Sequence, residues 1–212
     1  MKKKIITIDG PAASGKEKIS KYISKKLKFK HLDSGILYRR LAFIFLNNKV
    51  DINNLNHIKE NINKIKSFSF QKSKIIRTQE ISNLASKIAV YNFVRLYINK
   101  LQHDFVTKNK YFRGFVIDGR DIGSVVFKSA DIKLYVKVKA EIRAKRRYKQ
   151  LIDAGEKSIY PKILEEIKLR DIKDKCRKNS PLIVPNGAVK IDNNGELKKA
   201  LSKINRLVTK LS

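Results

Sequence analysis

The sequence predicts an α/β fold in which helices wrap a central parallel sheet. Short apolar runs alternate with longer stretches whose apolar residues recur at helical spacing, the pattern of strand–helix–strand units. A glycine-rich segment joins the first strand to the first helix, as it does at the ligand-binding edge of such sheets. A length of 212 residues and a hydrophobic content of 42% suffice for one domain with insertions.

The first element is a strand over residues 4–8, which runs into a glycine loop and then a helix. Gly10 and Gly15 frame the loop, and Lys16 follows it. Apolar residues then recur at helical spacing, at Ile19, Tyr22, Ile23 and Leu27. This order gathers backbone N–H groups and the positive end of a helix dipole around one point. The segment is therefore predicted to cradle phosphate, with Lys16 reaching the terminal phosphates of a nucleoside triphosphate.

One position departs from this phosphate-binding pattern. A Ser or Thr is expected after the lysine to help hold Mg²⁺, but Glu17 and Lys18 stand there instead. A carboxylate at a helix N-terminus is favourable in the empty protein, yet it repels a bound triphosphate.

The next cluster follows a predicted second strand, which ends near Asp33. Ser34, Gly35 and Arg39 come directly after it. Ligands bind at the carboxyl ends of strands in parallel sheets, so these side chains are candidates for substrate contact. An ordinary helix cap made by Asp33 or Ser34 is the alternative interpretation.

The stretch over residues 47–76 is polar and is interpreted as an insertion on the core. It carries one short helical pattern and a Ser-Phe-Ser-Phe alternation at residues 67–70. A helix is predicted over residues 76–86, with Gln79, Asn83 and Ser86 on one side, and Arg95 lies on the next helix. Its polar side is equally compatible with substrate contact and with a solvated face.

The remaining core elements alternate in the same way. Strands are predicted over residues 115–117, 133–138 and 189–191, and helices over residues 141–154 and 197–211. The strand at 115–117 ends in Asp118, Gly119, Arg120 and Asp121. Two carboxylates and an arginine at the carboxyl end of a strand suit phosphate, Mg²⁺ or base chemistry better than a core.

A further charged cluster lies on one helix face, where Arg170, Asp174 and Arg177 are spaced at i, i+4 and i+7. It is preceded by a basic helix that contains Arg143, Arg146 and Arg147. Ion pairs within the helix would explain this spacing. Arginines on a mobile segment that closes over two polyphosphates have the same composition.

Composition limits the remaining possibilities. The net charge of +30 suits a nucleic-acid binder, but the lysines are scattered and no aromatic stacking motif accompanies them, so we expect no nucleic acid partner. The single cysteine, Cys176, excludes an internal disulfide and predicts a cytoplasmic location. The apolar stretch after the first lysines stops at Asp9, and no run is long enough to span a membrane, so neither a secretion signal nor a membrane segment is expected.

These motifs together resemble the bacterial cytidylate kinases, which make CDP from CMP and ATP. The shared segments are Ile-Asp-Gly-Pro-Ala-Ala-Ser-Gly-Lys, Leu-Asp-Ser-Gly-Ile-Leu-Tyr-Arg, Ile-Arg-Thr-Gln-Glu-Ile, Asp-Gly-Arg-Asp-Ile-Gly-Ser-Val-Val-Phe and Arg-Asp-x-x-Asp-x-x-x-Arg-x-x-x-Pro-Leu. They occur in the family's order, and the match runs nearly from one end of the chain to the other, so the combination is far more specific than the glycine loop alone.

The resemblance implies a three-layer P-loop kinase fold with three parts. The core would comprise about residues 1–38, 91–154 and 182–212, a monophosphate-binding insertion about 39–90, and a helical lid about 155–181. The implied reaction is the phosphorylation of CMP and dCMP by ATP, in a protein that we expect to be a monomer. Mg²⁺ would be carried by ATP, with no metal ligand set in the protein.

The resemblance also implies roles for individual residues. ATP would be held by Gly10, Pro11, Ala12, Ala13, Ser14, Gly15, Lys16, Glu17, Lys18, Arg143 and Arg146. CMP would be held by Ser34, Arg39, Ser86, Arg95, Arg120, Asp121, Arg170, Asp174 and Arg177. Lys16, Arg120 and Asp118 would serve the transfer itself. A carboxylate such as Asp121 can accept from the amino group of cytosine, whereas it would face the O4 acceptor of uracil.

Two departures from the family leave alternatives open. Glu17 and Lys18 replace the usual Gly-Thr, and the stretch between Phe68 and Arg77 is shorter than in relatives, which predicts a trimmed antiparallel sheet. Another small-molecule P-loop kinase would share the glycine loop but not the later motifs. An inactive or nucleic-acid-binding descendant would suit Glu17 and the high charge.

Overall fold

Five short strands form one sheet in the computed structural model, which describes residues 3–71, 73, 75–153 and 155–209. The strands are β1 (Lys4–Asp9), β2 (Lys30–Asp33), β3 (Gly114–Gly119), β4 (Ile132–Lys137) and β5 (Val189–Asp192), in the order β2-β3-β1-β4-β5. β1 pairs in parallel with both β3 and β4, and β4 pairs in parallel with β5. The predicted parallel sheet and its predicted strands are confirmed.

The strand order brings the carboxyl ends of β3, β1 and β4, with the segments that follow them, to one edge of the sheet. Asp9 lies opposite Gly119 in the register of β1 with β3, and opposite Tyr135 in the register with β4. The chain leaves β1 toward β2 on one side, and β4 lies on the other side of β1. Such a reversal in strand order opens a crevice at the carboxyl ends of the strands, where ligands bind in these folds.

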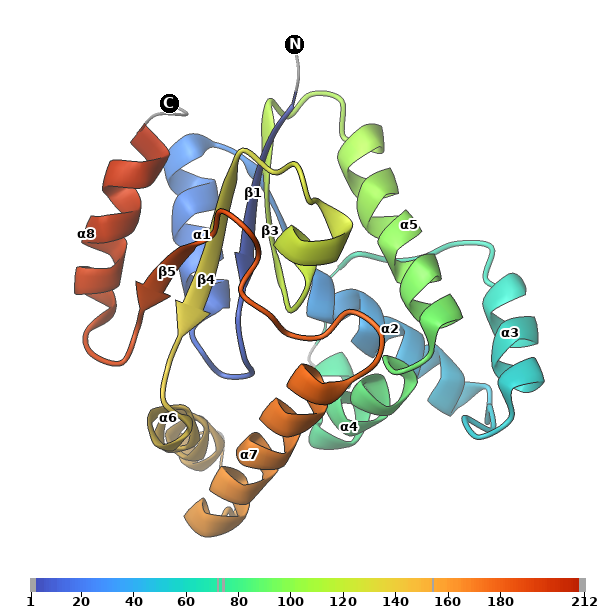
Figure 1. The fold of residues 1–212 in the computed structure, drawn as a ribbon. Helices are drawn as coiled ribbons and strands as arrows, with labels where there is room; N and C mark the ends of the chain where they lie inside the picture. The colour runs from blue at the N-terminus through green and yellow to red at the C-terminus, as the bar shows by residue number, and fades with distance from the viewer. Residues whose placement is uncertain (1–2, 72, 74, 154, 210–212) are drawn as a thin grey trace. The chain divides into compact units, whose positions relative to one another are not determined.

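Helices α1 (Lys16–Leu27) and α8 (Leu197–Val208) cover the same face of the sheet (Figure 1). Their apolar stripes, which include Ile19, Ile23 and Ile204, are fully buried against strand residues such as Ile8 and Leu134. The helix predicted over 197–211 is thus confirmed in its described part, whereas residues 210–212 lie outside the described residues.

Two further helices form a pair that follows β4. α6 (Ala140–Asp153) and α7 (Tyr160–Cys176) pack through a small apolar cluster that contains Ala144, Ile163 and Ile167. α6 confirms the helix predicted over 141–154, of which Ala154 lies outside the described residues. The five-residue π-helical turn η2 (Ile122–Val126) follows β3.

The sheet and these helices belong to one compact unit, which comprises the described residues up to Leu32 and from Asn109 onward. The second unit, Asp33–Lys108, contains the helices α2 (Ser34–Asn47), α3 (Leu55–Asn63), α4 (Gln79–Ile88) and α5 (Asn92–Lys108), together with the 3₁₀ turn η1 (Ile75–Arg77). The finer division into core, insertion and lid stays a prediction.

The second unit corrects the predicted helix over residues 76–86. α4 begins only at Gln79, because the side chain of Thr78 caps it by accepting a hydrogen bond from the backbone N–H of Ile81. The Ser-Phe-Ser-Phe alternation does not form a strand among the described residues. Its rings pack instead against α5, with centroid distances of 6.1 Å from Phe68 to Tyr97 and 5.3 Å from Phe70 to Phe105.

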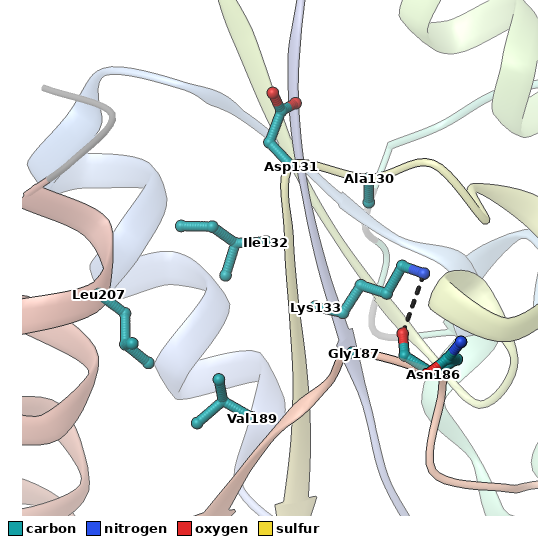
Figure 2. Close-up of a pocket in the computed structure, with 8 residues that line it drawn as sticks. All are labelled: Ala130, Asp131, Ile132, Lys133, Asn186, Gly187, Val189 and Leu207. Carbon is teal, nitrogen blue, oxygen red and sulfur yellow. Dashed lines mark hydrogen bonds between the residues drawn. The ribbon is translucent and has the colours of Figure 1, made fainter.

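A pocket of about 320 Å³ lies at the edge of the sheet where β4 and β5 begin. Figure 2 shows Ile132, Val189 and Leu207 on one side of the sheet, and Lys133, whose ammonium group donates to the carbonyl of Asn186 at 3.1 Å, on the other. Because parallel strands end at the opposite edge, this pocket is remote from the glycine loop that follows β1.

None of the described helices is both long and apolar enough to cross a lipid bilayer.

Candidate active site

The glycine loop between β1 and α1 adopts a shape that its two predicted glycines require. A Cβ on Gly10, where φ is +156°, would lie 2.7 Å from the carbonyl oxygen of Val136. Gly15 has a φ of +84°, and a Cβ there would lie 2.7 Å from the Asn193 amide nitrogen. Both glycines are therefore needed for close packing as well as for backbone freedom.

Three side chains hold carbonyl groups of this loop. Lys16 Nζ donates to the carbonyl of Pro11 at 3.1 Å, and Arg143 Nη1 donates to that of Ala12 at 3.2 Å. Asn193 Nδ2 donates to the carbonyl of Ser14 at 2.8 Å. In a trans peptide the N–H of the next residue points the opposite way from the carbonyl. The backbone N–H groups of Ala12, Ala13 and Gly15 therefore point away from the carbonyls that these side chains hold.

Glu17 lies on the first turn of α1, where its carboxylate forms an ion pair with Lys21 at 3.0 Å. The two residues are four apart on the helix, so the carboxylate extends along the helix surface. Lys18 is exposed. With Glu17 and Lys18 in place of the expected Gly-Thr, α1 begins at Lys16 directly after Gly15.

Asp9, at the end of β1, is a fully buried carboxyl group. Its two oxygens accept hydrogen bonds from the backbone N–H groups of Ile122 at 2.8 Å and Gly123 at 2.7 Å. Burial raises the pKa of Asp9 to about 7, and the charge of Asp121 adds to the rise, although the two N–H groups and Lys16 oppose it. Asp9 therefore joins the start of the glycine loop to the segment that follows β3.

The end of β3 supplies the predicted Asp118, Arg120 and Asp121. Asp118 is buried, and its Oδ1 lies 2.6 Å from His31 Nε2 on β2. Arg120 Nε donates to Asp174 Oδ2 at 2.9 Å. Asp121 is also buried, and its Oδ1 lies 3.9 Å from Arg177 Nη2. The strand end therefore meets Asp174 of α7 and Arg177 through charged groups. The prediction that Arg177 shares the helix face of Arg170 and Asp174 is wrong, because α7 ends at Cys176 and the backbone of Arg177 is extended.

Asp174 is the centre of this charged cluster. It is buried, and its second oxygen accepts from Arg177 Nη1 at 3.4 Å. Burial would raise the pKa of Asp174, but the positive charges of Arg120, Arg170 and Arg177 outweigh burial and lower the pKa below its ordinary value. Arginines with a buried carboxylate between them form a site suited to phosphate or to a sugar hydroxyl.

Arg143 and Arg146 of α6, the two arginines predicted to hold ATP, contact the loop region. Arg146 Nη2 donates to the carbonyl of Asn193 at 2.8 Å. Arg143 donates to the carbonyl of Val138 as well as to Ala12, and its guanidinium forms a two-pronged ion pair with Asp171 of α7. All three nitrogens of the Arg143 guanidinium thus donate hydrogen bonds to protein groups.

The other predicted residues belong to the second unit. Asp33 caps α2 by accepting from the Gly35 N–H at 3.0 Å, which confirms the capping interpretation, and Ser34 is the buried first residue of α2. The Arg39 guanidinium lies beside Gly35.

Arg95 and Ser86 lie on α5 and α4 of the same unit. Arg95 is 2% exposed, donates to the carbonyl of Ala89 at 2.9 Å, and lies with its guanidinium carbon 5.7 Å from the centre of the Tyr38 ring. Ser86 is half-buried. A buried arginine with a fixed orientation can donate hydrogen bonds to a nucleobase.

Sequence reasoning missed three residues that hold this region together: Asp9, Asp171 and Asn193. Asp9 ends a buried strand beside the first glycine, which is a usable signal for an acid at the sheet edge. Asp171 is adjacent to the predicted Arg170, but its carboxylate accepts a hydrogen bond from Arg143 of α6. Asn193 donates to the carbonyl of Ser14, which lies 179 residues earlier in the chain, and no local sequence pattern predicts this contact.

Comparisons with known proteins agree on one family. A sequence model of cytidylate kinase matches residues 6–210. Cytidylate kinase 1 of Haemophilus influenzae is 38% identical over 201 residues, which cover 89% of this chain and 85% of the relative. Cytidylate kinase of Rickettsia felis is 39% identical over 187 residues, covering 88% of this chain and 83% of the relative. Cytidylate kinase 2 of Haemophilus influenzae is 40% identical over 192 residues, or 84% of each chain.

Solved structures with a similar fold are more distant in sequence. TT1252 from Thermus thermophilus matches with a TM-score of 0.53 and 13% identity over 100% of both chains. An uncharacterized protein from Eubacterium ventriosum matches with a TM-score of 0.54 and 11% identity, over 98% of this chain and 99% of that one. At these identities the likeness concerns the fold alone.

Proposed function

Because the chain belongs to the cytidylate kinase family, we propose that it transfers the terminal phosphoryl group of ATP to CMP and dCMP. The single observation that carries this proposal is the arrangement at one edge of the sheet. The glycine loop with Lys16 follows one strand, and Arg120 and Asp121 follow the neighbouring strand, where they contact Asp174 of α7 and Arg177 directly after that helix. Phosphoryl transfer needs this combination of a phosphate cradle with positioned positive charge.

The donor side consists of the glycine loop, Gly10 to Lys18. Backbone N–H groups of residues 12–15 would receive the β- and γ-phosphates of ATP, and the helix dipole of α1 would favour their negative charge. Lys16 Nζ, now on the Pro11 carbonyl, would move to the transferred phosphate. Arg143 and Arg146 support the loop and the adjacent segment after β5.

The acceptor side uses the charged groups at the end of β3 and on α7. Arg120 would bind the CMP phosphate, and Arg170, Asp174 and Arg177 would bind its sugar. Asp121 would accept from the cytosine amino group. In the second unit, Arg39 is assigned to the phosphate, and Ser34, Ser86 and Arg95 to the base.

No side-chain nucleophile is required, because the acceptor phosphate oxygen itself attacks the γ-phosphorus of ATP. Lys16 and Arg120 would neutralise charge that moves onto the transferred group and the leaving ADP, and Asp118 would help to orient the acceptor. The described residues contain no cluster of three or more His, Cys, Asp or Glu side chains that could hold a metal ion. Mg²⁺ would be held mainly by ATP phosphate oxygens and would supply further charge neutralisation there.

Glu17 bears on whether the chain is an active kinase. An inactive descendant is favoured if this carboxylate points into the phosphate cradle. The ion pair between Glu17 and Lys21 instead favours the active enzyme, because it engages the carboxylate along the side of α1.

A coupled assay of ADP release over a panel of acceptors tests the proposal. The panel contains CMP, dCMP, UMP, AMP, GMP and two non-nucleotide acceptors, shikimate and gluconate, each with and without Mg²⁺. We expect CMP and dCMP to be the best acceptors, and Asp121→Asn to narrow the difference between CMP and UMP. Preference for another acceptor, or no Mg²⁺-dependent turnover with any, would overturn the proposal.

A further inference from the structure

We propose that Asp171 is a positioning residue for ATP binding, and that it acts through Arg143 on the glycine loop. The inference deepens the proposed function and rests on it, because ATP is taken as the ligand of the loop. Asp171 itself need not touch the nucleotide. Its influence would pass through one buried guanidinium that contacts the loop directly.

The first step is the burial of Arg143. Its side chain is 3% exposed, and its guanidinium is a positively charged group with five N–H donors and no acceptor. Nε donates to the carbonyl of Val138 at 3.1 Å, and Nη1 donates to the carbonyl of Ala12 at 3.2 Å. A single side chain thus links the segment after β4 to the glycine loop. A buried charge of this kind needs a carboxylate partner to offset its desolvation.

Asp171 is that partner, and it comes from a different helix. Its Oδ1 accepts from Arg143 Nη1 at 2.9 Å, and its Oδ2 accepts from Nη2. Two parallel hydrogen bonds fix the plane of the guanidinium as well as its position. Because Nη1 is shared between Asp171 and Ala12, the direction of the bond to the loop depends on Asp171.

The loop needs this support at the next residue. Ala13 has a φ of +56°, in the left-handed region that a residue with a Cβ adopts only at a cost. Arg143 holds the carbonyl of Ala12, the residue before Ala13, and Asn193 holds the carbonyl of Ser14, the residue after it. These two bonds stabilise the backbone shape of the loop, which is the proposed anion cradle. Loosening the Arg143 bond would let the loop relax and would weaken the anion cradle.

A different role for the same pair predicts the opposite effect. If Arg143 binds ATP phosphates directly, Asp171 competes with ATP for the guanidinium, and removing Asp171 strengthens ATP binding. If Asp171 positions Arg143, its removal weakens ATP binding. The sign of the change therefore distinguishes the two roles.

The test measures ATP binding to the full chain by calorimetry, together with KM for ATP and for CMP. We expect Asp171→Asn to weaken ATP binding about tenfold or more, and to leave KM for CMP within about twofold. Asp171→Glu should recover most of the loss. Glu166→Gln removes the same charge from an exposed position of α7 and should bind ATP like the unmodified chain.

Two further variants make the route of the effect visible. Arg143→Lys keeps the charge but loses the planar fork, so it should also weaken ATP binding selectively. In an Arg143→Ala background, adding Asp171→Asn should change ATP binding by less than about twofold, because the two residues act as one unit. A larger additional effect would show that Asp171 acts by another route.

The inference is overturned if Asp171→Asn binds ATP equally well or more tightly, or if both KM values rise together. A chain that binds no ATP overturns it as well. If ATP binds in an Asp171-dependent way but CMP is not phosphorylated, the proposed function fails and the positioning role stands.

Discussion

Glu17 shows how a single unusual residue can be accommodated in a phosphate-binding loop. Its carboxylate adds negative charge to the first turn of α1, where the triphosphate is expected, and two unit charges about 4 Å apart interact by about 4 kcal/mol at an effective dielectric near 20. The pairing with Lys21 offsets part of that charge and holds it on the helix surface. Glu17 therefore replaces the expected residue of the loop while adding little unpaired negative charge to it.

We predict that Glu17→Gly changes KM for ATP by less than about tenfold, a cost below roughly 1.4 kcal/mol. Lys21→Ala is the matched variant, because it releases Glu17 without removing it and should weaken ATP binding more than Glu17→Gly does. Steady-state kinetics with saturating CMP measure both. A chain that binds ATP only after Glu17→Gly/Lys18→Thr would show that the donor site has been lost.

Asp9 is the second residue whose environment decides its chemistry. Its folded pKa of about 7 lies above the ordinary value of 3.8, so between these values the folded chain binds more protons than the unfolded chain. The contribution of this group therefore makes the free energy of unfolding fall as pH rises from about 4 to about 7. The full shift corresponds to about 4 kcal/mol as an upper bound.

Asp9→Asn removes this titration, so its free energy of unfolding should decline less steeply over the same pH range. Asparagine also places an N–H₂ group against one of the two backbone N–H donors, so the variant should be less stable at every pH. Urea unfolding of both proteins at several pH values measures the two slopes. Equal slopes would contradict the raised pKa.

Helix α7 contributes Asp174 to the proposed CMP site. The residue accepts from Arg120 and from Arg177, so it holds both guanidinium groups in place. Asp174→Ala should raise KM for CMP by roughly tenfold or more and leave KM for ATP nearly unchanged. Lys173→Ala, the neighbouring exposed position on α7, serves as the control. An equal loss of ATP affinity would assign this face of α7 to the donor.

The glycine loop is the second element with a testable requirement. Gly10→Ala places a Cβ 2.7 Å from the carbonyl of Val136, so the loop must shift, and we predict a loss of ATP affinity of about tenfold or more. Gly187→Ala is the control, because Gly187 also has a positive φ, +71°, but has open space around its Cβ position. It should cost about 1–2 kcal/mol in stability without changing KM for ATP. Equal effects on ATP binding would mean that packing at Gly10 is unimportant.

The elements also show how far local sequence patterns reach. The alternation of apolar runs with helical patterns predicts the parallel strands, and the spacing of Gly10, Gly15 and Lys16 predicts the glycine loop. Both are predictable because residues close in the sequence determine them. The start of α4 was misplaced because a capping hydroxyl at Thr78 outweighed the apolar pattern around Ile76. The rings of Phe68 and Phe70 pack on a distant helix instead of forming a strand, so tertiary contacts decided their conformation.

At the scale of the whole molecule, the contacts that the sequence did not reveal join segments far apart in the chain. Asp9 accepts a hydrogen bond from Gly123, which lies 114 residues later in the chain, and Arg143 donates to Asp171, which lies 28 residues later. No short-range pattern specifies such pairs, because either partner alone resembles an ordinary surface acid or base. The predicted charged residues were nevertheless of the right type, since polyphosphate chemistry requires arginines and carboxylates at strand ends.

CMP phosphorylation by this chain is tested most sharply by the ratio of kcat/KM for CMP to that for UMP, measured with purified full chain, ATP and Mg²⁺ by the formation of the diphosphate product. Burying a mismatched polar pair costs about 1–3 kcal/mol, so we predict a ratio of roughly ten- to hundredfold in favour of CMP. Equal values for the two acceptors, or no CDP from CMP, would contradict the assignment of this chain as a CMP-phosphorylating kinase.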